Sequence, residues 1–183
     1  KIAVSRAKLY NVVEQPYTEH DIAYWERYGI STGVLGQYNV VSLSRFETQT
    51  EKGNTVFHNT PSSLMFGYKG GGFVKVYRPK EKCRFLFGGT KPNVYCFGLE
   101  YLPSRGDMLF ITGGEKDVLS LAAHGFNAIC FNSETATIPE SIVEMLQIRF
   151  KHIFVLFDTD ETGRRCMARA VESLSEYNVK SLL

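Results

Sequence analysis

The stretch HIFVLFDTDETGRR, residues 152–165, decides how this chain folds. It opens with an almost continuous apolar run, which is typical of a strand buried on both faces of a sheet. The run stops at Asp158, Thr159 and Asp160, and a helical pattern follows. A buried strand, an acidic turn and a helix in this order are the repeating unit of a parallel α/β sheet.

A second stretch, MLFITGGEKDVLSL at residues 108–121, has the same order of features. Its apolar run stops at Gly113 and Gly114, and carboxylates follow at Glu115 and Asp117. Apolar residues then recur at helical spacing. The sequence therefore predicts two acidic turns, each at the end of a buried strand.

Strands and helices alternate through the second half of the chain, so we expect an α/β domain with a parallel sheet and flanking helices. A smaller, β-rich α+β subdomain should precede it, and turn residues near 103–106 predict domains at 1–104 and 105–183. The expected elements of the second domain are strands at 108–112, 127–132, 152–157 and 179–183, and helices at 115–124, from Pro139 onward and at 161–176.

The two acidic turns should meet at one edge of the sheet. Right-handed crossovers bring the carboxyl ends of parallel strands to the same edge, where ligands bind in such folds. Carboxylates gathered there repel one another unless a hard cation neutralises them, which favours Mg²⁺, with Mn²⁺ as an alternative. One Asp-x-Asp turn alone is more often a turn or a helix cap, but two acidic turns at equivalent strand ends favour a metal site. The predicted cluster comprises Glu115, Asp117, Asp158 and Asp160, with Gly163 allowing a phosphate to approach the helix.

The first half of the chain begins with helices and continues with short strands. Residues 1–17 form an arm or a loosely placed strand, and Thr18 caps a helix that ends at Gly29. Trp25 on that helix is expected in the core rather than as a platform for stacking bases. A second short helix begins at Ser31. Strands are expected at 40–46, 55–58, 64–68, 73–79, 83–87 and 94–98, with a flexible hairpin turn at 70–72.

Basic residues concentrate in one part of this β-rich half, although the net charge of the chain is only +2. Between Lys69 and Lys91, seven basic residues stand against one acid, Glu81. Basic and aromatic side chains alternate here, a pattern suited to a surface that follows a phosphate backbone; a solvated edge strand protected by lysines is the alternative. The predicted phosphate contacts are Lys75, Arg78, Lys80, Lys82 and Arg84.

Cysteine usage, hydropathy and the first residue limit the class of protein. The four cysteines have no CxxC spacing and no histidines at ligand spacing, so neither a disulfide scaffold nor a structural zinc site is expected. No apolar run reaches the roughly 18 residues of a membrane span, and a cytoplasmic protein is expected. The chain opens on Lys1 rather than Met, which suggests an excised fragment.

The two acidic turns in their strand–helix context resemble the toprim domain, which bacterial-type DNA primases, phage primase-helicases, topoisomerases and some nucleases share. The resemblance covers residues 107–183 and rests on GGEKD and DTDETG. Upstream, YWERYGISTGVLGQYNV resembles the helical lead-in of primase cores, and KVYRPKEKCRFLF with VYCFGLEYLP resembles their connection into toprim. The whole chain is thus similar to a primase catalytic core, of a primase or a phage or mobile-element primase-helicase.

The resemblance implies a role for each residue of the two turns. Many primases carry a glutamate where this chain has Gly113, so Glu115, two residues on, is expected to take its place. Asp117 is expected to orient the metal site. The implied metal ligands are Glu115, Asp158 and Asp160, and the implied nucleotide-phosphate contacts are Gly114, Lys116 and Gly163.

The resemblance also implies an activity: Mg²⁺-dependent synthesis of short RNA primers from nucleoside triphosphates on a single-stranded DNA template. A replicative helicase, in the same chain or as a separate protein, is the expected partner, and no membrane partner is expected. Two alternatives stay open. One is a toprim nuclease or topoisomerase fragment, and the other is a single-stranded DNA-binding module in which Gly113 marks a loss of polymerisation.

Overall fold

The computed structural model describes residues 10–50 and 53–182, which form two compact units divided between Asn93 and Val94. The division precedes the predicted boundary because the segment at 94–98, expected to end the first domain, pairs with the sheet of the second unit. Strand β7 (Cys96–Phe97) lies antiparallel to a strand of that unit. Periodicity identified a strand here, but it carries no information about which sheet a strand joins.

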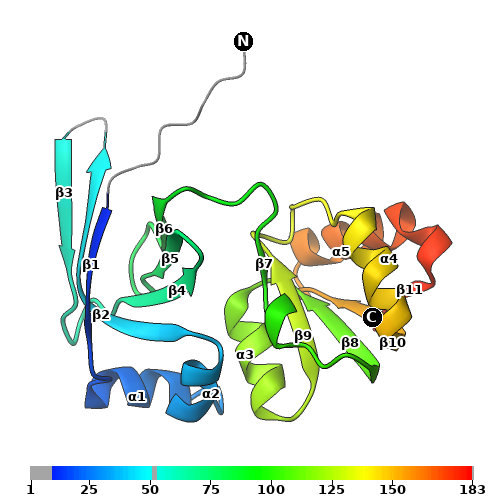
Figure 1. Ribbon diagram of the computed structural model, residues 1–183, viewed down its shortest axis with the longest axis horizontal. Coiled ribbons are helices and arrows are strands. Elements are labelled where there is room, and N and C mark those ends of the chain that lie inside the picture. The colour runs from blue at the N-terminus through cyan, green and yellow to red at the C-terminus, as the bar shows by residue number, and fades with distance from the viewer. Residues whose placement is uncertain (1–9, 51–52, 183) are drawn as a thin grey trace. The chain divides into compact units, whose positions relative to one another are not determined.

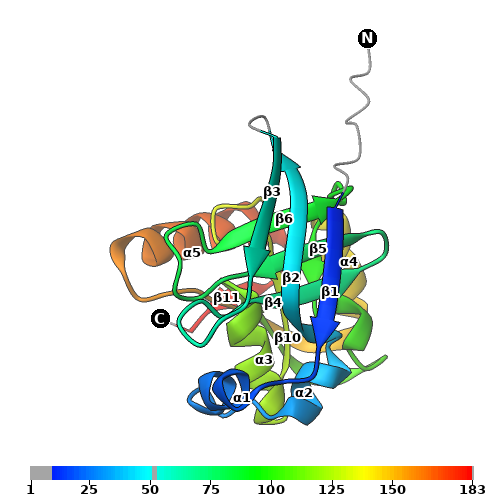
Figure 2. The same ribbon diagram turned by 90° about the vertical axis from the view of Figure 1, so that its left-hand side faces the viewer.

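The first unit is built on a six-stranded antiparallel sheet in the order β1-β2-β4-β5-β6, with β3 paired to the long strand β2. Figure 2 shows β1, β2 and β3 side by side. Residues 10–15, expected in an arm or a loose strand, form β1 and pair with β2 throughout. The strands are β1 Tyr10–Gln15, β2 Val40–Thr50, β3 Gly53–His58, β4 Phe66–Gly70, β5 Phe73–Tyr77 and β6 Phe85–Gly89.

Two helices, α1 (Glu19–Glu26) and α2 (Thr32–Gln37), connect β1 to β2. The cap at Thr18 is as predicted: its hydroxyl accepts from the Asp21 amide at 3.2 Å, and Asp21 Oδ2 accepts from the Thr18 amide at 2.9 Å. Asp21 also accepts from the Ser42 hydroxyl at 2.9 Å, which ties α1 to β2. Trp25 is fully buried, so its assignment to the core is confirmed.

Strand β5 lies in the interior of the first sheet. It pairs with β4 on one side and β6 on the other, and Val74, Lys75 and Val76 are all buried. The interpretation of this stretch as a solvated edge strand is therefore wrong. The hairpin turn before it was predicted correctly, and it depends on glycine because Gly72 has a φ of +79°.

The second unit is the predicted α/β domain, with a five-stranded sheet in the order β11-β10-β8-β9-β7. The first four of these strands are parallel, and β7 adds an antiparallel edge. The strands are β8 Gly106–Thr112, β9 Asn127–Phe131, β10 Phe150–Leu156 and β11 Val179–Ser181. The helices are α3 Glu115–Ala123, α4 Glu140–Arg149 and α5 Glu161–Ser173, with 3-10 turns at Leu99–Tyr101 and Ser175–Tyr177.

Helices cover both faces of this sheet (Figure 1). Val143 of α4 and Met167 of α5 pack into one apolar core with Leu109 and Ile111 of β8. Helix α3 lies on the opposite face (Figure 1). Within the described part of the chain, no helix has both the length and the apolar character needed to cross a membrane.

Candidate active site

The chain reverses its direction of travel across the second sheet at the pair β8–β10. From β8 it moves to β9 through α3, and after α4 it returns to the other side of β8 as β10. The turns leaving β8 and β10 therefore lead to helices on opposite faces, as Figure 1 shows for α3 and α5. In open parallel sheets, a crevice at such a switch point is where ligands bind.

The register of β8 and β10 places the two acidic turns side by side. Thr112, the last residue of β8, pairs with Leu156, the last residue of β10. The Gly113 turn and the Asp158 turn thus begin at almost the same level on neighbouring strands. The sequence-based prediction that the fold brings these turns together is borne out by this pairing.

The turn after β10 is closed by Asp160, which is the N-cap of α5. Its Oδ1 accepts a hydrogen bond from the Gly163 amide at 2.7 Å. Gly163 is buried, and a Cβ there would collide with the carbonyl oxygen of Asp158. The requirement for glycine is therefore a tight contact with the turn itself. Asp158, Thr159 and Asp160 all expose their side chains.

The turn after β8 places charged side chains in the first turn of α3. Gly114 is the N-cap of this helix and provides no side chain to cap it. Glu115 is only 2% exposed, while Lys116 and Asp117 are half-buried. Negative charge is favoured at a helix N-terminus, because the unpaired amides carry a partial positive charge. That attraction helps to accommodate the two acids.

Asp117 shows that several of the carboxylates influence one another. Burial raises the pKa of its carboxyl from 3.8 to about 6; Lys116 opposes this, and the negative charges of Asp158, Glu115 and Glu134 add to it. Three of the four predicted acids, Glu115, Asp117 and Asp158, are therefore electrostatically coupled. Asp160 is placed beside them by the same turn as Asp158, in its capping role.

Glu134 belongs to the same neighbourhood, although it was not among the residues predicted from the sequence. It lies on the loop after β9, and its Oε1 accepts from the Asp158 amide at 3.1 Å. A Cβ on Gly113 would lie 2.5 Å from this same oxygen. The available signal was its place just after β9, the second parallel strand of this unit along the chain. Unlike the two predicted turns, the loop after β9 has no second acid next to Glu134, so it was not predicted to belong to the site.

The chemistry of these donors fits a hard divalent cation, because they are carboxylate oxygens without thiolate or imidazole. Among residues 10–50 and 53–182, no three histidine, cysteine, aspartate or glutamate side chains are already grouped to hold a metal ion.

Two of the predicted DNA-contacting residues, Lys75 and Arg78, make contacts within the first unit instead. Lys75 is 2% exposed, and its Nζ lies 4.5 Å from the centre of the Phe85 ring. Its assignment to an exposed phosphate-binding surface is wrong, because the side chain is buried beside the Phe85 and Phe87 rings. Arg78 is half-buried: its guanidinium lies over Phe57 and pairs with Glu81 at 3.4 Å.

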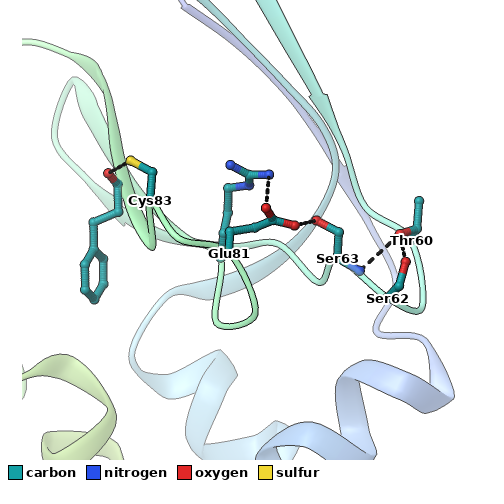
Figure 3. Close-up of polar contacts among 7 residues, drawn as sticks. Thr60, Ser62, Ser63, Glu81 and Cys83 are labelled. Atoms are coloured by element: carbon teal, nitrogen blue, oxygen red, sulfur yellow. Dashed lines mark hydrogen bonds and ion pairs between the residues drawn. The ribbon is translucent and has the colours of Figure 1, made fainter.

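The other three predicted DNA contacts, Lys80, Lys82 and Arg84, lie on the loop between β5 and β6. This loop is fastened to the segment at 60–63, since Glu81 accepts from the Ser63 hydroxyl at 2.6 Å (Figure 3). Lys80 donates from Nζ to the Pro61 carbonyl at 2.9 Å. Lys82 and Arg84 are exposed. These contacts hold the loop between β5 and β6 in place, so we call it the braced loop, and these three basic side chains are exposed.

Comparison with known proteins agrees with this architecture. Residues 110–183 match the family model described as Toprim-like. No curated protein sequence matches the chain.

The same fold occurs in solved primase structures. The primase fragment of the bacteriophage T7 primase-helicase is 16% identical, with a TM-score of 0.56 over 86% of this chain and 62% of that one. The Aquifex aeolicus primase, comprising its zinc-binding and RNA polymerase domains, is 16% identical, with a TM-score of 0.60 over 90% and 49%. The Escherichia coli primase catalytic core is 16% identical, with a TM-score of 0.60 over 87% and 62%.

The fold and the site define an α/β domain, of which residues 110–183 match the Toprim-like family model, preceded by an antiparallel β unit. More particularly, the chain has the fold of the DNA primase catalytic cores. It spans less than two thirds of the length of each of these three structures.

Replacing Gly163 with alanine should destabilise the protein by about 2–4 kcal/mol, because the added methyl meets a backbone carbonyl that cannot move freely. Urea unfolding measures this directly. Gly36→Ala is the matched control: no atom lies within 4 Å of the added carbon, and alanine in a helix should stabilise by up to about 1 kcal/mol. Equal effects of the two substitutions would contradict the packing of Gly163 against Asp158.

Asp117 should make stability depend on pH in the absence of divalent cations. The folded protein holds this proton more tightly than the unfolded chain, because burial raises the pKa to about 6. The resulting stabilisation is complete below about pH 4 and is lost as the pH rises through 6. Compared with Asp117→Asn, the wild type should lose about 2 kcal/mol between pH 4 and 7. Urea unfolding in EDTA measures both proteins, and a constant difference would contradict the raised pKa.

Proposed function

We propose that this chain is the catalytic core of a DNA primase, which synthesises short RNA primers from nucleoside triphosphates on single-stranded DNA. The observation that carries the proposal is the pair of acidic turns on either side of the switch point between β8 and β10. The fold also supports the proposal, because its similarity to primase cores extends over both units of this chain.

In this proposal the two turns bind a metal ion and the nucleotide phosphates. Glu115, Asp158 and Asp160 would hold Mg²⁺, for which Mn²⁺ can substitute. When bound, the ion would neutralise the triphosphate and the charge that develops as the primer's 3′-hydroxyl attacks the α-phosphate and pyrophosphate leaves. Asp117 orients these carboxylates from its half-buried position.

The helix N-termini beside the turns suit the phosphates. Amides at the start of a helix attract anions, and Gly114 is the N-cap of α3 at this edge. Lys116 adds a positive charge in the same turn. The buried Gly163 lets the first turn of α5 pack against Asp158 without a side chain between them.

The template is proposed to contact the braced loop of the first unit. Lys80, Lys82 and Arg84 are exposed there and provide the cations that a phosphate backbone requires. Arg78 supports the loop through Glu81 instead of reaching outward. A replicative helicase, in the same chain or as a separate protein, is the proposed partner, as in the T7 primase-helicase.

Primer synthesis tests the acidic site. Asp158→Ala and Asp160→Asn should each reduce Mg²⁺-dependent primer synthesis on single-stranded DNA at least about 100-fold, because each removes a charge from the metal site. Asparagine at 160 keeps the helix cap, so a loss of activity is not a loss of folding. Glu172→Gln, which removes an exposed acid of the same helix, should retain activity.

The same assay separates the alternatives. Mg²⁺-dependent cleavage of DNA without primer synthesis would overturn the proposal in favour of a toprim nuclease. Binding of single-stranded DNA with neither reaction would indicate a binding module.

Salt dependence of binding tests the basic loop. Lys82→Ala and Arg84→Ala should each weaken single-stranded DNA binding and lower the slope of log K against log salt by about 0.7, the value for one lost phosphate contact. Fluorescence anisotropy at several salt concentrations measures this slope. Lys180→Ala, an exposed lysine of the second unit, should leave it unchanged. Equal slopes for all three variants would place the template elsewhere.

A further inference from the structure

We propose that Glu134 is a positioning residue that joins the two acidic turns, and that Gly113 provides the space its carboxylate occupies. This inference rests on the proposed function, because it assigns a role within the same site. It concerns a residue from a third strand end, the loop after β9. Two independent contacts carry it.

The first contact is a hydrogen bond across 24 residues of sequence. Glu134 Oε1 accepts from the backbone amide of Asp158 at 3.1 Å. This amide is at the residue where the Asp158-Thr159-Asp160 turn begins. A carboxylate acceptor makes the bond stronger than one between neutral groups. Glu134 therefore fixes the backbone from which Asp158 projects.

The second contact is with Gly113, in the turn after β8. A Cβ built on Gly113 would lie 2.5 Å from Glu134 Oε1, 2.8 Å from its Cγ and 3.1 Å from its Cδ. Real Cβ atoms do not approach other atoms so closely, so a side chain at 113 and the Glu134 carboxylate compete for one space. At the next residue, Gly114, a Cβ would meet only Asp117 Oδ2, at an ordinary 3.7 Å.

Together the two contacts make Glu134 a link between the turn after β8 and the turn after β10. The carboxylate also lies close enough to Asp117 to contribute to the charge that this residue experiences. The first turn has no acid at 113, and the loop after β9 supplies one beside it. Glycine at 113 is then a structural requirement of Glu134 and does not mark a lost function.

Displacing the carboxylate in two different ways tests the pairing. Glu134→Ala removes it, and Gly113→Ala should push it aside, so each should speed hydrogen exchange of the Asp158 amide at least about 10-fold in the metal-free protein. The double variant should be no faster than Glu134→Ala alone, because both changes remove the same bond. Glu134→Gln keeps an oxygen acceptor and should retain most of the protection. NMR of the whole chain measures all four.

The role in the reaction has a separate measurement. Glu134→Ala and Gly113→Ala should raise the Mg²⁺ concentration needed for half-maximal primer synthesis by about 10-fold, the size expected for a residue that orients metal ligands. For Glu134→Gln this Mg²⁺ concentration should stay within about 3-fold of the wild-type value. Thr137→Ala, an exposed residue of the same loop, is the control and should have the wild-type value.

Unchanged exchange of the Asp158 amide in Glu134→Ala or Gly113→Ala overturns the pairing. Additive effects of the two substitutions also overturn it. A Gln variant as impaired as Ala in Mg²⁺ dependence overturns the positioning role in favour of direct action by the charge. If both variants lose protection of the Asp158 amide while the wild-type chain makes no primers, the pairing is supported and only the primase activity is contradicted.

Discussion

The parallel pairing of β8 with β10 is the constraint on which the rest of the site depends. Because Thr112 and Leu156 end their strands opposite each other, two turns far apart in sequence begin at one level. The helices that follow leave on opposite faces of the sheet, so neither blocks the edge between the turns (Figure 1). Polar side chains that contribute little to stability can then lie together in the crevice at the carboxyl ends of these two strands. A slip of β8 by one residue against β10 would turn its side chains to the other face of the sheet, and the apolar packing of Leu109 and Ile111 against α4 and α5 opposes it.

Glycine has a specific spatial task at two points of the site. At Gly163, the first turn of α5 approaches the carbonyl of Asp158 so closely that no side chain fits. At Gly113, the space is taken by the outer atoms of Glu134. These cases differ in cost: a backbone carbonyl cannot move aside, whereas the end of a glutamate can. A substitution at 163 therefore acts mainly on stability, and one at 113 acts mainly on the position of Glu134.

The sequence predicted the second unit well because its signals are local. Apolar runs, acidic turns and helical stripes give each element within a few residues, and the handedness of crossovers brings the turns to one edge. The first unit was harder, since the alternation in FVKVYR is the same for an edge strand and an interior one. Lys75 is buried against Phe85 of the neighbouring strand β6, a tertiary contact that periodicity does not contain. The same limit explains why β7 was assigned to the wrong sheet. Glu134 was missed because its contacts with Gly113 and Asp158 are made across loops.

Opposing electrostatic effects act on the acids of the site, and their balance indicates how the site would respond to a cation. The N-terminus of α3 attracts Glu115 and Asp117, an effect of about 0.3–1 kcal/mol per charge when exposed. Burial and the neighbouring carboxylates destabilise the ionised form of Asp117. Their effect is the larger one, because the pKa of Asp117 rises to about 6 despite Lys116. A shift of this size corresponds to about 3 kcal/mol, more than the helix terminus provides. The folded chain therefore holds its acids together at a cost that packing elsewhere offsets. Such an arrangement favours any cation that enters it, since each positive charge relieves repulsion that the fold has already imposed.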